Sequence, residues 1–147
     1  MKKIMMLVAL VLEVWRIIRD SRLGFDGWNV EVVDDAIVYN GAEVPFVGLC
    51  VEGEKMVYMS ISKIAEDAKL ADVSFWKAAR LNIRHEFRHA WQFEAIGYEL
   101  CKLDLQNSLY FQSVLEIDAY NYQLRGVNTP MEALAQTIRN RQAGRKF

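Results

Sequence analysis

Apolar residues recur every three or four positions in the first twenty residues and again in the second half of the chain, which is the spacing of amphipathic helices. In the first segment they form one stripe: Ile4, Val8, Val11, Trp15 and Ile18. The charged residues lie on the other side: Glu13, Arg16 and Asp20. The pattern predicts a helix that packs its apolar stripe against the rest of the domain.

The same segment has a second interpretation as an export signal, because Lys2 and Lys3 precede an apolar run. Glu13 interrupts that run and no small-x-small cleavage site follows it. The run is also shorter than the roughly 20 residues that span a bilayer. We therefore favour a packed helix in a cytoplasmic protein, with export as the alternative.

Between residues 30 and 60 the pattern changes to short runs of β-branched and aromatic residues separated by turn-forming residues. Asn40-Gly41 is typical of a two-residue hairpin turn. These runs predict a small, twisted antiparallel sheet. The last strand, Met56–Ser60, is the candidate for a sheet edge beside the helical half, with an interior position as the alternative.

Helical spacing returns after the strands. Residues 62–70 predict a short helix. Asp72 or Ser74 then caps a long helix over residues 75–96, which Gly97 ends in a left-handed conformation.

Two more helices are expected towards the end of the chain. The first covers residues 107–124, ends before Gly126 and directs five residues to the core: Leu109, Phe111, Val114, Leu115 and Ala119. Thr129 and Pro130 open the last one as N-cap and first helical residue. The expected fold class is α+β, with one domain over residues 1–147.

Composition narrows the class of protein. A chain of 147 residues with 52% hydrophobic and 25% charged residues can bury one core. Its net charge of −1 gives no electrostatic reason to expect nucleic acid or an anionic membrane as a partner. Cys50 and Cys101 are typical of buried thiols in a reducing compartment, with one disulfide as the alternative.

The candidate chemistry lies on the long helix. His85 and His89 are the only histidines of the chain, and Glu86 follows the first of them. Residues i and i+4 share a helix face, so both imidazoles can reach one metal ion. In zinc peptidases with this His-Glu-x-x-His pattern, the glutamate takes a proton from metal-bound water. Two unliganded histidines on a core helix are the alternative.

A catalytic zinc site needs a third protein ligand and an open position for water. The chain has no third histidine, so a carboxylate must supply this ligand. Glu94 points roughly 140° away from His89 around the helix axis. Glu116 is the first choice, because an antiparallel neighbouring helix can place it opposite the histidines, and Asp118 is the second. Two more carboxylates lie between the helices: Glu99 and Asp104.

A family resemblance rests on these residues. The segment His85-Glu86-Phe87-Arg88-His89-Ala90-Trp91-Gln92, with Glu116-x-x-Ala119-x-x-Tyr122 downstream, resembles the gluzincin metallopeptidases, particularly short phage and bacterial proteins with a His-Glu-x-Arg-His-x-x-Gln helix. It is more distantly similar to the ImmA/IrrE family. The likeness covers about residues 56–122 and implies a minimal zincin-like domain with Zn²⁺ at His85, His89 and Glu116 and with Glu86 as general base.

The chain departs from thermolysin-like gluzincins at Tyr120, where those proteins have an aspartate that orients a histidine. Either Tyr120 or Asp118 is therefore expected to orient an imidazole, or no residue does. The candidates for stabilising an oxyanion are Tyr120, Tyr122 and Arg88. Each also has a structural interpretation, such as an ion pair between Arg88 and Asp118.

The resulting hypothesis is a zinc-dependent metallopeptidase that hydrolyses a peptide or protein substrate, with the substrate backbone held along a sheet edge. The alternative is a non-catalytic or single-partner regulatory zinc domain of a phage or mobile-element switch, as the ImmA likeness suggests.

Overall fold

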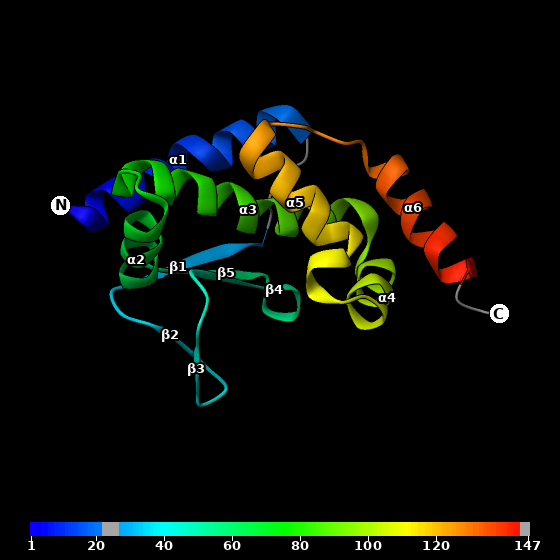
Figure 1. Cartoon of the computed structure of the whole chain (residues 1–147), viewed down its shortest axis with the longest axis horizontal. Coiled ribbons are helices and arrows are strands. Elements are labelled where there is room, and N and C mark those ends of the chain that lie inside the picture. The colour runs from blue at the N-terminus through cyan, green and yellow to red at the C-terminus, as the bar shows by residue number, and fades with distance from the viewer. Residues whose placement is uncertain (22–26, 145–147) are drawn as a thin grey trace.

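The computed structural model describes residues 1–21 and 27–144, and within these ranges six α-helices and two small sheets form a mostly helical α+β fold (Figure 1). The predicted fold class is confirmed at this level. The helices are α1 (Lys2–Ser21), α2 (Ile61–Ala71), α3 (Phe75–Ile96), α4 (Tyr98–Asn107), α5 (Val114–Arg125) and α6 (Met131–Gly144). Among the described residues no helix is both long and apolar enough to cross a membrane.

The larger sheet has three strands in the order β1-β5-β4: β1 (Asn29–Val33), β5 (Met56–Ser60) and β4 (Gly48–Val51). β4 pairs antiparallel with β5, but β1 pairs parallel with it. The prediction of an all-antiparallel sheet was therefore wrong. The reason is that the Asn40-Gly41 hairpin, which joins β2 (Ile37–Tyr39) and β3 (Ala42–Val44), forms a separate two-stranded sheet.

The predicted hairpin turn itself is confirmed. Asn40 and Gly41 have φ angles of 51° and 77°, the positive values that a two-residue turn of this kind requires. By contrast, β5 was the candidate edge strand, and it lies in the centre of its sheet. Val57, Met59 and Ser60 are buried there, as is typical of a strand with neighbours on both sides. The edge next to the helices is β4.

Helix α3 is the central element, with α1, α2 and α5 packed along it and β4 across its remaining face (Figure 1). It has the predicted bounds, and the Ser74 hydroxyl caps it by accepting a hydrogen bond from the Lys77 amide. Gly97 ends it with φ 100° and ψ 141°, so the predicted left-handed helical conformation is not adopted.

The orientation of α1 differs from the prediction. The apolar stripe through Val11 and Trp15 is exposed, and the helix instead buries another set of residues: Met6, Ala9, Leu10, Glu13 and Ile17. Glu13 is fully buried because its carboxylate accepts hydrogen bonds from Arg80 and Arg84 of α3, at 2.6 and 2.7 Å. Pairing with two arginines allows a charged residue to lie inward.

Replacing Glu13 by glutamine is expected to lower the free energy of unfolding by about 3 kcal/mol, because two arginines lose their charged partner in a largely buried contact. Urea denaturation measures this change. Glu66→Gln is the matched control: its carboxylate is exposed and 3.7 Å from Lys63, and its loss is expected to cost roughly 0.5 kcal/mol or less. Equal losses of stability from the two substitutions would show that the ion pairs of Glu13 with Arg80 and Arg84 do not stabilise the fold more than an exposed pair does.

The predicted helix over residues 107–124 is divided in the structure. α4 ends at Asn107, a short 3₁₀ helix η2 covers Tyr110–Gln112, and α5 begins at Val114. The Asp104 carboxylate accepts hydrogen bonds from the Val114 and Leu115 amides, which starts a new helix there. Of the five predicted core residues, Val114, Leu115 and Ala119 are buried and Leu109 is exposed. The Phe111 side chain lies outside the described part.

Candidate metal centre

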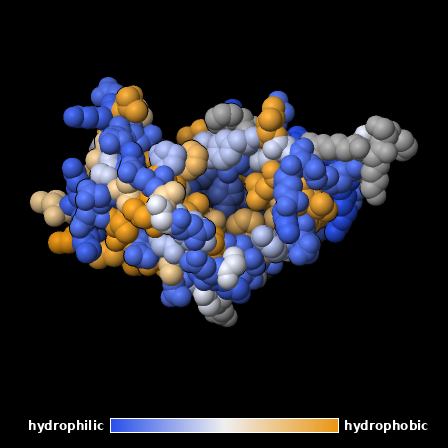
Figure 2. Space-filling model, turned by 90° about the horizontal axis from the view of Figure 1, so that it is seen from below, coloured by the Kyte–Doolittle hydropathy of each residue, from blue (hydrophilic) through white to orange (hydrophobic). Residues whose placement is uncertain are grey.

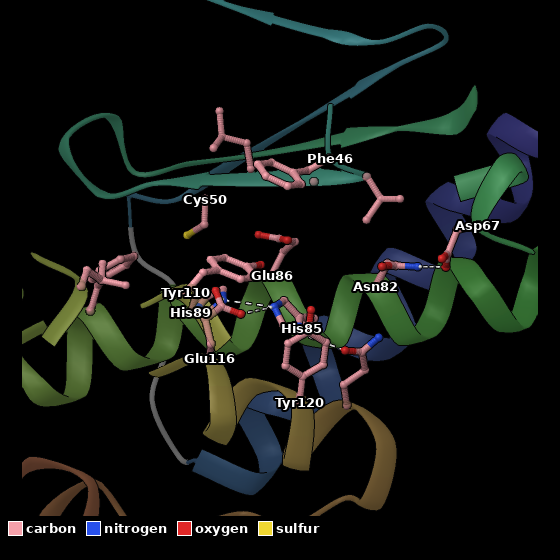
Figure 3. Close-up of a pocket in the computed structure, with 16 residues that line it drawn as sticks. Phe46, Cys50, Asp67, Asn82, His85, Glu86, His89, Tyr110, Glu116 and Tyr120 are labelled. Atoms are coloured by element: carbon pink, nitrogen blue, oxygen red, sulfur yellow. Dashed lines mark hydrogen bonds and ion pairs between the residues drawn. The ribbon is translucent and has the colours of Figure 1, made fainter. Parts of the chain in front are cut away.

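Two helices bring three potential metal ligands together. His85 and His89 lie one turn apart on α3, with their Nε2 atoms 3.2 Å apart. Glu116 of α5 faces both, with one carboxylate oxygen 3.1 Å from His85 Nε2 and the other 2.9 Å from His89 Nε2 (Figure 3). One ligand atom from each residue lies within 4.8 Å of the other two, and all three residues are buried.

The second nitrogen of each imidazole is held by a glutamine. His85 Nδ1 lies 2.9 Å from Gln123 Oε1, and His89 Nδ1 lies 2.8 Å from Gln92 Oε1. An amide oxygen only accepts hydrogen bonds, so each Nδ1 carries a proton, and each Nε2 is the atom that faces Glu116 and would bind a metal ion in its unprotonated form. Two imidazole nitrogens and one carboxylate, facing a cleft, match the ligand set of a catalytic zinc site.

The Gln92 amide is itself fixed by its surroundings. Its nitrogen donates to the Leu115 carbonyl and to the Asp118 carboxylate, at 2.9 and 2.7 Å, so its oxygen must face His89. Asp118 in turn receives two hydrogen bonds from Arg88, at 2.7 and 3.0 Å. Asp118 thus acts on His89 only through Gln92. This orienting role of Gln92 was not predicted.

Arg88 and Tyr122, predicted as possible oxyanion stabilisers, have structural contacts instead. Arg88 Nη1 donates to Asn128, and Nη2 donates to the Thr129 carbonyl as well as to Asp118. The guanidinium lies over the rings of Trp91 and Tyr122. The Tyr122 hydroxyl donates to Asp20 of α1 at 3.0 Å. Neither side chain lines the cleft.

The alternative third ligands also have other contacts or positions. Asp104 caps α5, and Glu99 is exposed at the start of α4. Glu94 accepts a hydrogen bond from Trp28 and pairs with Lys55, as its predicted direction away from His89 allows.

The charges at the centre are strongly coupled. Burial alone would raise the pKa of Glu116, but hydrogen bonds from His85 and His89 lower it to about 2. Burial likewise opposes the charged form of His89, but Glu116 and Glu86 raise its pKa to about 9. Without a metal, His89 and Glu116 therefore form an ion pair at neutral pH, and a bound metal ion takes the place of the proton.

Glu86 lies beside the three ligands, where it faces the sheet and the cleft (Figure 3). Burial raises its pKa from the ordinary value of 4.5, which makes the carboxylate a better proton acceptor. The backbone of β4 passes directly over it. A Cβ atom at Gly48 would come within 2.6 Å of Glu86 Cγ, so only glycine allows this close approach.

The centre opens into a cleft of about 380 Å³ between α3 and the segment from Phe46 to Cys50. Figure 2 shows a hollow on this face, with a hydrophilic floor and hydrophobic residues on its rim. Asp67, hydrogen-bonded to Asn82, marks a polar end of the cleft (Figure 3). Leu105 and Phe93 are among its apolar lining residues.

Two tyrosines line the cleft near the histidines. The Tyr120 ring lies 4.6 Å from the His85 ring, so the predicted residue reaches the site. Tyr110 of η2 was not predicted. Burial and the nearby charge of Glu116 raise the pKa of both hydroxyls, and the two are hydrogen-bonded to each other. Both hydroxyls therefore remain protonated at neutral pH, when they can donate hydrogen bonds.

Replacing Gln123 by alanine is expected to weaken zinc binding by about 10- to 100-fold, because His85 loses the partner that fixes its ring and tautomer. Competition with a chromophoric chelator measures the affinity. The control is Gln136→Ala, since Gln136 is exposed on α6 and its side chain donates a hydrogen bond to Asn140. Equal affinity of the Gln123 variant and the unaltered protein would show that the contact does not orient the ligand.

Comparison of the chain with protein-family models, with curated proteins and with solved structures found no match.

Proposed function

We propose that this chain is a zinc-dependent metallopeptidase of gluzincin type, with a minimal zincin-like domain. The observation that carries the proposal is the convergence of His85, His89 and Glu116 at the floor of a cleft, with the buried Glu86 beside them and a sheet edge above. A purely structural zinc site needs no carboxylate next to its ligands, whereas hydrolysis needs a proton acceptor in this position.

A zinc ion at this centre would polarise the scissile carbonyl and lower the pKa of water from about 15.7 towards about 7. Glu86 would take the proton from the attacking water and pass it to the leaving amine. The position of Glu86 beside the three ligands (Figure 3) suits both steps, because one carboxylate there can accept the proton and then return it.

The edge strand β4 suits an extended peptide. One side of β4 pairs with β5, and its residues Gly48, Leu49 and Cys50 line the cleft. Unpaired N–H and C=O groups at a sheet edge bind any peptide backbone, so they position a substrate irrespective of its sequence. This assigns to β4 the role that the sequence had suggested for β5.

The hydroxyl of Tyr120 is the donor best placed to stabilise an oxyanion, because the Tyr110 hydroxyl already donates its proton to Tyr120. Both line the cleft on the side of Glu116, and their raised pKa values keep the protons in place. Hydrogen bonds to a developing negative charge lower the barrier to attack.

The test is hydrolysis of a mixture of unstructured peptides by the zinc-loaded full-length protein, followed by mass spectrometry. We expect cleavage that a chelator abolishes and added zinc restores. Zinc binding with no cleavage, together with tight binding of one peptide or protein, would favour a non-catalytic regulatory domain instead.

Replacing Gly48 by alanine is expected to lower kcat/KM by about 10²-fold, because the added Cβ displaces Glu86 or moves β4 away from it. Kinetics on any cleaved peptide measures this effect. Gly53→Ala is the control, since a Cβ there meets nothing within 4 Å. If the Gly48 variant keeps full activity, the close approach of β4 to Glu86 has no part in the reaction.

A further inference from the structure

The side of α1 that faces away from the protein is almost entirely apolar. Val11 is 70% exposed, Ile4 66% and Trp15 62%, and the same face includes four more exposed residues: Leu7, Val8, Leu12 and Ile18. These residues continue over the length of the helix at spacings of three and four. A contiguous apolar surface of this kind marks an interaction site.

The helix cannot hide this surface by rotating about its axis. Its opposite face is held by the fully buried Glu13, which pairs with Arg80 and Arg84. At its C-terminal end, Asp20 accepts a hydrogen bond from the Tyr122 hydroxyl. Within the described residues, α1 lies along one side of the molecule with α3 and α5 inside it and no element outside it (Figure 1). The apolar face is therefore a fixed part of the surface.

Basic residues border this face at both ends. At one end, Lys3 is exposed and the Lys2 ammonium lies over the Phe75 ring of α3. Near the other end, Arg16 is 4.0 Å from Glu13 and Arg19 pairs with Asp20. Between Lys3 and Arg16 the only charged residue is Glu13, which is buried. Residues 1–21 thus carry a formal charge of +2 from four basic and two acidic side chains, although the whole chain carries −1.

We propose that α1 docks the protein onto an anionic lipid surface, with the helix lying in the plane of the interface. An apolar helix face flanked by basic residues binds in this way, because the apolar side chains enter the acyl boundary and the cations meet the headgroups. Trp15 suits the interfacial region, and Arg19, whose guanidinium lies over the Trp15 ring, and Lys3 are long enough to reach the headgroups. The expectation of no membrane contact came from the net charge, which conceals this local distribution.

A second copy of the chain fits the same face less well. In a parallel pair of α1 helices, Lys2 and Lys3 would lie beside their own copies. In an antiparallel pair they would lie near Arg16 and Arg19. Both arrangements bring like charges together, whereas anionic headgroups complement both ends of the helix.

Docking through α1 leaves the metal centre accessible. The hollow in Figure 2 is seen from below the view of Figure 1, and α1 lies at the top of that view. The cleft therefore opens away from the proposed lipid surface, and the proposal does not depend on the reaction assigned to the cleft.

Co-sedimentation with lipid vesicles tests the proposal. We expect the full-length protein to bind vesicles made of equal parts of phosphatidylglycerol and phosphatidylcholine, but not vesicles of phosphatidylcholine alone. The double variant Lys2→Gln, Lys3→Gln should bind about 25-fold more weakly. Val11→Asp should abolish binding, and because Val11 is largely exposed, its circular dichroism and thermal unfolding should not change.

Leu109→Asp is the control, since Leu109 is as exposed as Val11 but lies between α4 and η2. Its binding should equal that of the unaltered protein. Absence of vesicle binding, or full binding by the Val11 variant, would overturn the proposal. A dimer in solution that Val11→Asp dissociates, with no binding to either vesicle, would assign the face to a second copy instead.

Discussion

Replacing Glu86 by glutamine is expected to reduce peptide hydrolysis by about 10³-fold while zinc remains bound. Glutamine keeps the size and the packing against Gly48, but its amide cannot accept a proton from water. Glu86 is not one of the three convergent ligands, so the metal content should not change. Turnover kinetics and metal analysis of the same preparation measure both quantities.

Glu94→Gln is the matched control for this substitution. Glu94 lies on the same helix, but its carboxylate contacts Trp28 and Lys55 rather than the cleft. Its variant should hydrolyse peptides at the normal rate. Undiminished hydrolysis by the Glu86 variant would remove the proposed mechanism, and loss of zinc from it would show that Glu86 belongs to the ligand set.

The placement of the two candidate histidine ligands could be predicted because it depends on local geometry. The helical repeat alone places His85 and His89 on one face, and the structure brings them within hydrogen-bonding distance of each other. Glu116 followed from the absence of a third histidine and from the position of a carboxylate in a later helix. Its contact with both imidazoles agrees with that prediction.

The partners that orient the histidines could not be derived in the same way. Gln92 lies three residues after His89, so its proximity is local, but its role depends on Asp118 and Arg88. Gln123 of α5 contacts His85 of the neighbouring helix α3, and nothing in the sequence around Gln123 indicates that contact. Such contacts depend on how α5 packs against α3.

The orientation of α1 shows where hydrophobic patterns fail. A pattern places a carboxylate in water and apolar residues in the core, because it treats each residue separately. Here Arg80 and Arg84, more than sixty residues later, compensate the buried charge of Glu13. The prediction of an antiparallel sheet was wrong for a related reason. Strand order depends on pairings between residues distant in sequence, such as that of β1 with β5.

Replacing Glu116 by glutamine is expected to weaken zinc binding by about 10²- to 10³-fold. Binding of zinc to a four-ligand site is worth about 10–16 kcal/mol, so one charged ligand contributes roughly 3–4 kcal/mol. Chelator competition measures the affinity. The control is Glu132→Gln, an exposed carboxylate in the first turn of α6. Full zinc occupancy without Glu116 would mean that another residue completes the site.

The Glu116→Gln substitution should also change how the stability of the metal-free protein depends on pH. The raised pKa of His89 contributes stability that is complete below the ordinary value of 6.5 and is lost as the pH rises through about 9. The lowered pKa of Glu116 contributes stability that is complete above 4.5 and is lost as the pH falls through about 2. The ion pair therefore stabilises the metal-free protein most between about pH 4.5 and 6.5.

Without the Glu116 carboxylate, this maximum should flatten, because burial then opposes the charged form of His89 and only the weaker effect of Glu86 and Gln92 still favours it. Urea denaturation of chelator-treated protein at a series of pH values measures the change. If the profile keeps its maximum in the Glu116 variant, the ion pair is not its source. A flattened profile combined with weak zinc binding would show that the Glu116 carboxylate both stabilises protonated His89 and binds the metal. Zinc binding below about pH 9 must then release a proton from His89.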